Sequence, residues 1–372
     1  KHTHLRWDRI QSVDTTQNIL ARIFRQGTLT VDSAGGAGEK MKLGLLTLSE
    51  CHALRHAILA VSASVRAGTP YVIPDWQAEA MLGEASIGAA AEAEEVPVYR
   101  LNNGRMLGIS VLSGAALGGV ISLVGAIVMA VVMDGLAAIP LFVLVGGTVW
   151  SALKNLAKRW GTRVFLASNG LRVRSGLVTT YAQTIPPGRV HAIEIVQPVL
   201  WRRMGWWRVR LTIASSDMSD AMDSMQLSSM LIPAGTRAEV DRMLWILLPD
   251  LGVDDPNAFL AESFEGTGGS VLYLPAPTRS RLLDPFGWKR NAIALTRTIA
   301  AMRWGGFWRR SLTIVWHDHY QSIALTQGPL QRRLNLADLK FRLVGAQLRP
   351  AQGHLDIDDA HRVLWAESGM GK

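Results

Sequence analysis

Arginine and tryptophan recur together in two short stretches of the sequence. The first, WRRMGWWRVR, occupies residues 201–210, and the second, RWGGFWRR, occupies residues 303–310. A guanidinium group binds phosphate oxygens through a rigid fork of N–H donors, and an indole ring settles at the boundary between lipid and water. Both stretches therefore indicate a surface for lipid headgroups or for an acidic partner. Two alternatives stay open, because tryptophans in small barrels are more often core and because arginine with aromatics also binds nucleic acid.

A hexapeptide, Gln-x-x-Leu-x-Arg, adds a third basic position, at residues 17–22, 197–202 and 327–332. Its leucine is expected to face a core, with the arginine roughly opposite. The simpler interpretation is a glutamine that caps a helical turn beside a solvated arginine. The functional interpretation adds these arginines to the basic surface. The candidate partner- or lipid-binding residues are Arg22, Arg202, Arg203, Trp206, Trp207, Arg208, Trp304, Trp308, Arg309, Arg310, Arg332 and Arg333.

Patterns typical of enzymes are weak in this chain. His317 with His319, and His52 with His56, would each share one face of an element, but two imidazoles without a third ligand rarely hold a metal. Residues 34–40, AGGAGEK, lack the Ser or Thr that ends a phosphate-binding loop. We therefore expect no enzymatic activity, no metal and no cofactor. A metal-dependent enzyme built on His317 and His319 is the third-ranked hypothesis.

Two long uncharged segments predict how the chain that holds these residues is anchored. Residues 106–133 contain no charged side chain, and after Asp134 neither do residues 135–153. About 20 apolar residues suffice for a helix to cross the hydrocarbon layer, and soluble core helices are seldom apolar on every face over such lengths. The sequence therefore predicts a transmembrane helical hairpin over residues 106–156.

The charges beside the hairpin predict its orientation. Arg100 and Arg105 precede it and three basic residues follow within residues 154–159, whereas the connection carries only Asp134. By the positive-inside rule both flanks, and with them all the remaining domains, are expected in the cytoplasm. This tether also makes nucleic acid an unexpected partner.

Small residues recur every four positions along the first predicted span. Such a stripe lets another helix approach closely, either the second span of the same hairpin or a helix of a partner. The two alternatives weigh equally on the sequence. The predicted helix-packing residues are Ser110, Gly114, Gly118, Ser122 and Ala126.

Composition agrees with a membrane protein of several domains. The chain has 372 residues and a formal net charge of +9, and its mean hydropathy is +0.16. The positive charge suits anionic phospholipid as well as nucleic acid. Cys51 is the only cysteine, so an internal disulfide is excluded.

The hexapeptide also marks an internal repeat. In each copy an alternating, strand-like stretch precedes the glutamine, and a short helix, a strand and a longer helix follow. The longer helices are expected to begin at Thr47, Thr236 and Asp356, the first two with capping boxes. Gly205 and Asn335 are expected to end the short helices in a left-handed conformation.

Copies two and three share an upstream pair of strands that the first copy lacks. The sequence therefore predicts that the first copy is incomplete and that the chain begins within a domain. The predicted organisation is an incomplete first domain (1–65), an Ala/Glu-rich linker (66–105), the hairpin (106–156), a second domain (160–250), a linker (251–282) and a third domain (283–368).

The repeated segments at residues 9–24, 189–204 and 319–334, with the hairpin between them, resemble the bacterial PH-domain membrane proteins of the YdbT-like type. The resemblance implies a membrane-anchored α+β protein, with PH-like antiparallel β-barrels or sandwiches each closed by a C-terminal helix. It also implies an inner-membrane location, no catalytic activity, and a smaller single-domain PH-like membrane protein or self-association as the partner. His191 and Ala192 depart from the Gln-Ser of the other copies, so the second site is expected to differ if that pair matters.

The resulting hypothesis is a non-enzymatic scaffold whose cytoplasmic PH-like domains bind a protein partner or anionic lipid headgroups. The resemblance places such proteins in cell-envelope stress or in resistance to membrane-acting peptides. The alternative is an accessory subunit of a membrane transport or export complex. In that case the small-residue stripe would pack on a helix of the partner.

Overall fold

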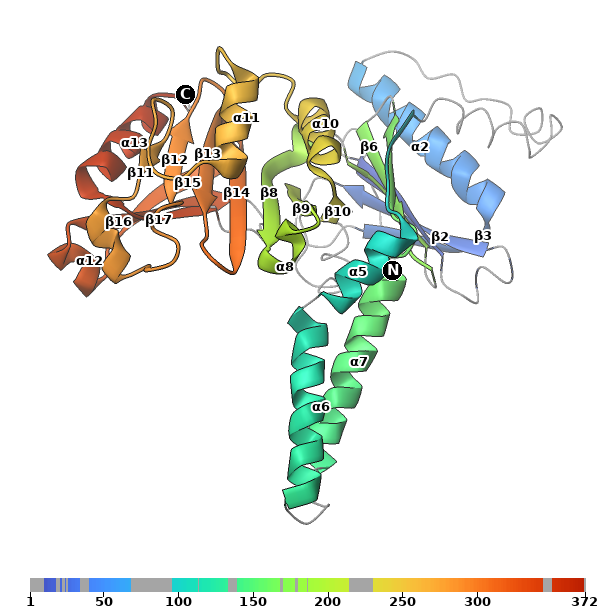
Figure 1. Ribbon diagram of the computed structural model, residues 1–372. Helices are drawn as coiled ribbons and strands as arrows, with labels where there is room; N and C mark the ends of the chain where they lie inside the picture. Colours follow the sequence, from blue (N-terminus) through green and yellow to red (C-terminus); the bar gives the residue numbers. More distant parts are fainter. Residues whose placement is uncertain are drawn as a thin grey trace. The chain divides into compact units, whose positions relative to one another are not determined.

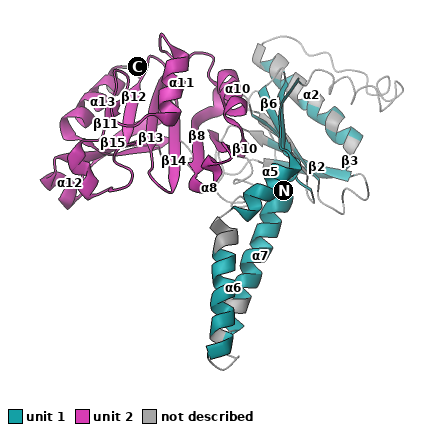
Figure 2. Ribbon diagram, in the orientation of Figure 1, with its two compact units in different colours: residues 1–186 teal, residues 187–372 magenta. Residues whose placement is uncertain are grey.

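The computed structural model divides the chain into two compact units, residues 1–186 and residues 187–372 (Figure 2). It describes residues 10–17, 21, 24, 26–33, 40–67, 96–112, 114–132, 139–167, 170–177, 180–185, 187–213, 230–343 and 350–370.

The first unit contains a seven-stranded antiparallel sheet in the order β3-β2-β1-β7-β6-β5-β4. Helix α2 packs against β1, β2 and β3 (Figure 1), over a buried cluster that includes Val13, Leu29 and Ile58. The strands are β1 (Ile10–Gln17), β2 (Gln26–Ser33), β3 (Lys40–Thr47), β4 (Val96–Arg100), β5 (Arg163–Ala167), β6 (Gly170–Ser175) and β7 (Thr180–Ile185). The helices are α2 (Leu48–Ala67), α5 (Asn103–Val111), α6 (Gly114–Val132) and α7 (Ile139–Arg159).

Helices α6 and α7 lie side by side as a hairpin (Figure 1). A side chain at Gly119 of α6 would come within 3.3 Å of Thr148 Oγ1 of α7, and Ala126 is fully buried. Gly118 and Ser122 are half-buried. Ser110 lies on α5, where its hydroxyl donates to the Met106 carbonyl.

The first predicted span is not one continuous helix. Helix α5 ends at Val111 and α6 begins at Gly114, and the backbone N–H of Leu112 closes α5 onto the carbonyls of Gly108 and Ser110. Glycines on both sides of the break lower the helix propensity there, so a charge-free run need not be one helix.

Within the described parts of the chain, no helix meets both the length and the apolarity that a bilayer-crossing segment needs.

The second unit contains two antiparallel sheets. Seven strands follow the order β10-β9-β8-β14-β13-β12-β11, and three form a second layer, β15-β16-β17. Helices α10 and α11 cover one face of the larger sheet, and α13 packs on the smaller one. The strands are β8 (Val190–Pro198), β9 (Trp207–Ile213), β10 (Met230–Gly235), β11 (Leu274–Pro275), β12 (Ala292–Leu295), β13 (Ile299–Trp304), β14 (Arg309–Trp316), β15 (Tyr320–Thr326), β16 (Leu336–Leu343) and β17 (Ala351–Asp356). The α-helices are α8 (Val199–Arg202), α10 (Arg237–Leu247), α11 (Pro256–Glu265), α12 (Pro329–Arg333) and α13 (Ile357–Met370), and the 3₁₀ turns are η3 (Pro187–Arg189), η4 (Thr278–Leu282) and η5 (His317–His319).

The core of the second unit joins its two sheets face to face. Met302 and Val315 of the larger sheet meet Leu339 and Phe341 of β16 and Val363 of α13 in one buried cluster. The two sheets pack against each other through their apolar faces, and α13 covers the smaller sheet. The second unit is therefore a sandwich closed by a C-terminal helix. This antiparallel α+β architecture agrees with the predicted PH-like fold class.

The repeated glutamine has a definite structural role. Gln17 Nε2 donates to the carbonyl of Gln26 at 2.9 Å, and Gln327 Nε2 donates to that of Leu336 at 2.8 Å. Each bond ties the end of one strand to the first residue of the next, and in the third copy it spans the short helix α12. In the first and third copies the glutamine therefore links two consecutive strands, and in the third the N-cap of the short helix is Gly328 and not the glutamine that the simpler interpretation expected.

The predicted helix ends are confirmed. Thr236 and Glu239 form a reciprocal capping box, and the backbone N–H groups and side chains of Thr47 and Glu50 are paired in the same way. Gly205 and Asn335 have φ values of 63° and 50°, which is the left-handed conformation expected after the short helices.

The larger sheets combine strands from successive copies of the repeat. Strand β1 of the first copy pairs with β7, and β8 of the second copy pairs with β14 of the third. The residues predicted as the second domain are accordingly divided, with β5 to β7 in the first unit and β8 to β10 in the second.

Parts of both predicted linkers are folded. Strand β4 lies within predicted linker 66–105 and pairs with β5. Helix α11 lies within predicted linker 251–282 and buries Phe259, Leu260 and Phe264. Both elements are short, so their apolar residues give no clear period in the sequence.

Candidate functional site

The two tryptophan–arginine stretches meet at one corner of the second unit. Pairing of β8 with β14 sets Arg310 opposite Gln197 and Arg309 opposite Pro198, so α8 begins beside the β13–β14 turn. The N–H of Val199 donates to the Trp308 carbonyl at 2.8 Å, and Arg202 Nη2 donates to the Gly306 carbonyl at 2.7 Å. Residues 201–210 and 304–310 together form what we call the Trp–Arg corner.

Two glycines make the turn of this corner. Gly305 has φ +102°, and a Cβ there would collide with the Arg309 carbonyl oxygen. A Cβ at Gly306 would collide with the Phe286 carbonyl. Only glycine fits both positions, and the tight turn presents the next two aromatic residues to solvent.

The aromatic side chains of the corner divide into core and surface. Trp201 is 1% exposed and Trp207 is 5% exposed, and Trp207 meets Phe264 edge-on at 4.9 Å. Trp206 and Trp304 are half-buried. Phe307 is 58% and Trp308 73% exposed, so these two rings are the ones available to an apolar environment.

The arginines of the Trp–Arg corner differ in their exposure to solvent and in their contacts. Arg208 lies over the Trp201 ring at 4.8 Å, and Arg309 lies over the Trp304 ring at 4.2 Å. Arg203 is exposed, and Arg310 is half-buried. Burial, and after it the positive charge of Arg310, lower the pKa of Arg202. An anion at the corner would therefore relieve repulsion between close guanidinium groups.

Two buried arginines lie behind this corner: Arg290, which sequence reasoning missed, and Arg303, which it included in the second basic stretch as part of a surface. Arg290 and Arg303 donate to main-chain carbonyls at the C-terminal end of α11 and just beyond it. Burial lowers the pKa of Arg290 to about 10, and the charges of Arg310 and Arg303 act in the same direction. No spacing rule predicts these contacts, because their acceptors lie 24 to 41 residues away in the chain.

The remaining arginine candidates lie elsewhere. Arg332 and Arg333 are exposed on α12, which packs against β16, and so they belong to the smaller sheet and not to the corner. Arg22 lies outside the described residues, as do the side chains of His52 and His56 and most of the AGGAGEK segment.

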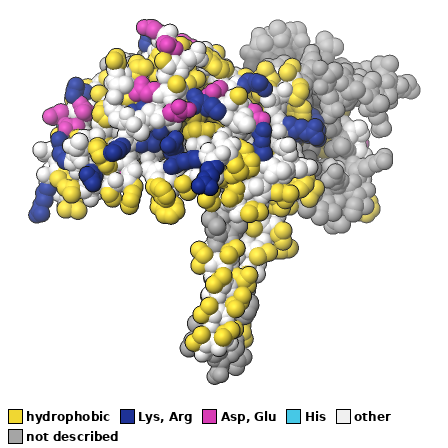
Figure 3. Space-filling view, viewed as in Figure 1, with side chains coloured by type: hydrophobic (Ala, Val, Ile, Leu, Met, Phe, Trp, Pro, Cys, Tyr) yellow, Lys and Arg dark blue, Asp and Glu magenta, His cyan; other side chains and the backbone are white. Residues whose placement is uncertain are grey.

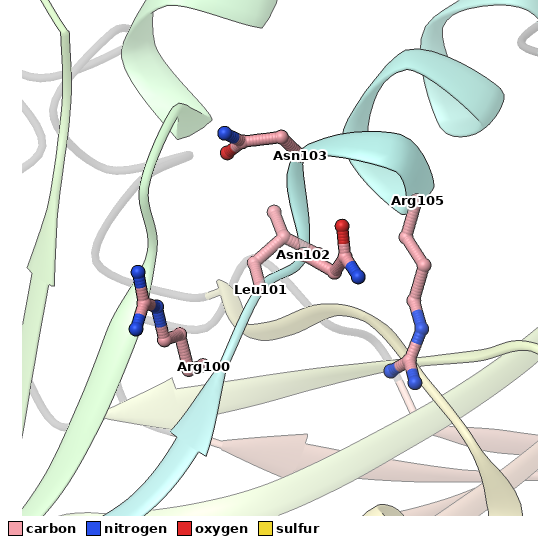
Figure 4. A pocket seen from close by; sticks show the side chains of 5 residues that line it. All are labelled: Arg100, Leu101, Asn102, Asn103 and Arg105. Carbon is pink, nitrogen blue, oxygen red and sulfur yellow. The ribbon is translucent and has the colours of Figure 1, made fainter.

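In the first unit, a cavity of about 480 Å³ lies where β4 passes into α5 (Figure 4). Arg100, Leu101, Asn102, Asn103 and Arg105 line it, and the two arginines lie on either side of the Leu101–Asn102 segment. Leu101 N–H donates to the Thr162 carbonyl at 2.9 Å, and Asn102 Oδ1 caps α5 by accepting from Gly104 N. This junction presents arginine and amide donors beside the helical hairpin.

His317 and His319 do not converge on one point. Both ring nitrogens of His317 have partners, Glu367 Oε2 at 2.8 Å and the Thr296 carbonyl at 3.0 Å. His319 stacks on His191, with ring centroids 5.0 Å apart, and its Nδ1 lies 2.8 Å from the Val190 carbonyl. Among the described residues, no group of three or more His, Cys, Asp or Glu side chains could hold a metal ion.

Comparison with known proteins adds a family. The sequence pattern of the bacterial PH domain matches residues 1–61, 110–243 and 257–366. The UPF0699 transmembrane protein YdbT of Bacillus subtilis (strain 168) is 21% identical over 275 residues, which cover 68% of this chain and 54% of that protein. The chain thus spans about half the length of this relative. No solved structure matches the chain.

Proposed function

The chain belongs to the bacterial PH domain family, and from that premise we propose that it is a non-enzymatic scaffold of the bacterial inner membrane. In this proposal α6 and α7 cross the membrane, and the PH-like units bind anionic lipid headgroups and a protein partner in the cytoplasm. The relative of similar sequence is called a transmembrane protein, which supports the membrane location.

The observation that carries the proposal is the apolar outer surface of the helical hairpin. In Figure 3 this pair is covered largely by hydrophobic side chains. Soluble proteins rarely leave a contiguous apolar surface of this kind in water, whereas hydrocarbon would cover it. The exposed apolar residues with large side chains are Val120, Ile121, Leu123, Val124, Ile127, Val128, Val131 and Val132 on α6, and Ile139, Val143, Leu144, Val149, Trp150 and Leu153 on α7.

Basic residues at the ends of the hairpin support an orientation in which both ends face the cytoplasm. Lys158 and Arg159 occupy the last turn of α7, and Arg100 and Arg105 line the cavity before α6. Arginines at the ends of membrane-spanning helices bind lipid phosphates and are attracted to the negatively charged cytoplasmic leaflet. We propose that this cavity holds a lipid phosphate.

The Trp–Arg corner is the second proposed lipid contact. Phe307 and Trp308 are exposed beside Arg203 and the Arg202–Arg310 pair. Indole rings sit at the interface while guanidinium groups bind the phosphates next to them. The corner therefore suits an anionic membrane surface better than a neutral one.

A label at the corner tests this proposal. We expect a polarity-sensitive dye on Trp308→Cys to shift to shorter emission wavelength when the full chain is placed in nanodiscs with anionic lipid, but not in purely zwitterionic discs. Raising salt should reverse the shift. Cys51 is buried and would react slowly.

Trp365→Cys is the matched control, because Trp365 on α13 is 73% exposed, as Trp308 is. The label at position 365 should not respond to lipid charge. Equal emission from position 308 in both kinds of disc, or an equal shift at position 365, would contradict membrane contact by the corner.

Strand β15 is the proposed site for the protein partner. In the first two copies of the repeat, the strand that leads to the repeated glutamine pairs with the last upstream strand of the next copy. These strands are β1, which pairs with β7, and β8, which pairs with β14. Strand β15 holds the same position in the third copy, yet among the described strands only β16 pairs with it. Seven of the nine residues of β8 are buried, whereas none of the seven of β15 is. An open edge of this kind accepts a strand, so we propose that a further PH-like domain supplies one.

Charges placed on this edge should block the partner. We expect Gln321→Lys combined with Ser322→Lys, both exposed, to abolish copurification of a PH-like partner from mild detergent, because edge lysines prevent strand addition. Asn257→Lys with Ala258→Lys, on the exposed side of α11, is the control and should retain the partner. Retention by the edge variant, or recovery of no partner by the unaltered chain, would contradict the proposal.

A further inference from the structure

The leucine of the repeated hexapeptide is exposed in both copies where the structure describes it. Leu200 on α8 is 39% exposed, and Leu330 on α12 is 60% exposed. The prediction that this leucine faces a core is therefore wrong. The residue after it is the buried one in each copy, Trp201 at 1% and Gln331 at 8% exposed. Helices of only four and five residues are too short for the apolar spacing to identify their inner face.

Basic and apolar residues follow the exposed leucine at fixed spacings. Arginine pairs stand two and three positions after it, at residues 202–203 and 332–333, and three of these four arginines are exposed. Met204, four positions after Leu200, is 36% exposed, and Phe24, at the same position of the first copy, is 69% exposed. A single exposed leucine would need no explanation. A leucine that recurs with cations on a one-turn helix indicates a contact surface.

Helices α8 and α12 belong to one edge of the second unit. Two hydrogen bonds of the Trp–Arg corner join α8 to the β13–β14 turn. A Cβ at Gly306 in that turn would collide with the Phe286 carbonyl, so the loop after η4 lies against the turn. Arg279 of η4 donates from Nε to the Leu334 carbonyl at 2.6 Å, at the end of α12. In Figure 1 both short helices lie along the lower edge of the unit.

We call these four segments, residues 199–206, 278–289, 305–310 and 329–335, the apolar edge. Figure 3 shows hydrophobic side chains along this margin of the second unit, with Lys and Arg side chains directly above them. Between the two short helices, the exposed apolar residues are Leu282 (76%), Phe286 (74%), Phe307 (58%) and Trp308 (73%).

The charge of the apolar edge is strongly positive. Its one acidic residue is Asp284, which is half-buried and accepts from the Gly287 N–H. The edge therefore complements an anionic surface. Its exposed basic residues are Arg203, Arg279, Arg281, Lys289, Arg332 and Arg333.

This pattern suits a lipid surface better than a protein surface. A protein interface excludes charge from its apolar core, whereas arginines here alternate with the apolar residues along the chain. The apolar residues also lie on four separate segments, and fluid acyl chains adapt to separated side chains. The long arginine stems let the guanidinium groups reach the phosphates while the neighbouring apolar groups enter the hydrocarbon boundary.

We propose that α8 and α12 insert Leu200 and Leu330 among the acyl chains of an anionic membrane, with Arg203, Arg332 and Arg333 at the phosphates. The inference rests on the lipid contact proposed for the Trp–Arg corner. It extends that contact from headgroups at one corner to insertion along a whole edge, including the third copy of the repeat.

Depth-dependent quenching in nanodiscs tests the insertion. A fluorophore is attached to Leu200→Cys or to Leu330→Cys in the full chain, and the lipid carries a nitroxide either on the headgroup or near the start of the acyl chain. We expect the acyl-chain nitroxide to quench both labels at least about twofold in anionic discs and much less in zwitterionic ones, because insertion follows electrostatic attraction.

Trp245→Cys and Trp365→Cys are the matched controls. Trp245 is 39% exposed, as Leu200 is, and Trp365 is 73% exposed. They lie on α10 and α13, outside the apolar edge, so neither label should be quenched.

Arginine variants test the placement of the cations. Arg332→Gln with Arg333→Gln should reduce the quenching of the label at position 330 to about half or less. Arg242→Gln with Arg362→Gln, exposed on α10 and α13, should leave it unchanged. An equal loss from both pairs would overturn the placement of Arg332 and Arg333 at the phosphates.

Absence of quenching at positions 200 and 330 would overturn the insertion, and a label at position 308 then separates the two proposals. Quenching at 308 alone would leave the corner contact standing, whereas no quenching at any of the three positions would contradict both. Quenching at 200 and 330 but not at 308 would support the insertion and contradict the corner contact. An emission shift at 200 or 330 without quenching would mean that a protein surface covers the leucines, and it would also overturn the proposal.

Discussion

Replacing Arg303 with methionine is expected to lower the free energy of unfolding of the second unit by about 3–5 kcal/mol. The Arg303 side chain is fully buried. Its Nη1 donates to the carbonyl of Glu262 at 3.0 Å and to Glu262 Oε1 at 3.3 Å, and its Nη2 donates to the Gly268 carbonyl. Methionine has a comparable length but no donor, so the variant leaves the Glu262 carboxylate and the Gly268 carbonyl without this donor, and the Glu262 carbonyl keeps only the Gly266 N–H, at the end of α11.

The loss should exceed that of an ordinary surface ion pair. Arg297 lies near Asp254 at 3.5 Å, with both side chains mostly exposed, so Arg297→Met is the control and should cost less than about 1 kcal/mol. Urea unfolding of the full chain in detergent, followed by tryptophan fluorescence, measures both. A cost for Arg303→Met within 1 kcal/mol of the control would show that the buried arginine does not hold α11 in place.

Local signals in the sequence predicted local structure well. Thr236 three residues before Glu239 predicts a capping box, and Gly205 and Asn335 predict left-handed ends; all of these are confirmed. Each depends on groups within a few residues of one another, which sequence spacing reports directly.

The same reasoning could not predict which strands, far apart in the sequence, pair with one another. The sequence singles out residues 201–210 and 303–310 separately, but only the pairing of β8 with β14 places them at one corner. The repeat predicts three copies, yet a sheet that joins strands of two copies cannot be deduced from their alignment.

The second large effect is expected in the pH dependence of stability, through His317. Burial and nearby charge act on the pKa of this residue in opposite directions. Burial by itself would lower the pKa of His317, but the hydrogen bond and charge of Glu367, helped by the Thr296 carbonyl and Asp318, raise it above its ordinary value. One ring nitrogen faces the Glu367 carboxylate and the other faces a carbonyl. Both positions require an N–H, so the imidazolium form is the one that fits.

A raised folded-state pKa has a definite sign in the pH dependence of stability. The folded chain binds the proton more tightly than the unfolded chain, so the stabilisation is complete below about pH 6.5 and is lost as the pH rises through the folded-state value. After deprotonation, the lone pair of Nε2 faces the Thr296 carbonyl, and Glu367 keeps Tyr320 as its other donor, at 3.0 Å.

Glu367→Gln should weaken this dependence. The variant removes both contributions of Glu367, so the burial that lowers the pKa of His317 is opposed only by the Thr296 carbonyl and Asp318. Less stabilisation is then lost as the pH rises above about 6.5. We therefore expect the stability difference between the unaltered chain and the variant to be largest near pH 5.5 and to shrink steadily toward pH 8.5. Urea unfolding at several pH values measures it, with Glu265→Gln, at an exposed position on the last turn of α11, as the control. A difference that stays constant across this range would mean that His317 is neutral in the folded protein, and that Glu367 is held by Tyr320 and not by an imidazolium.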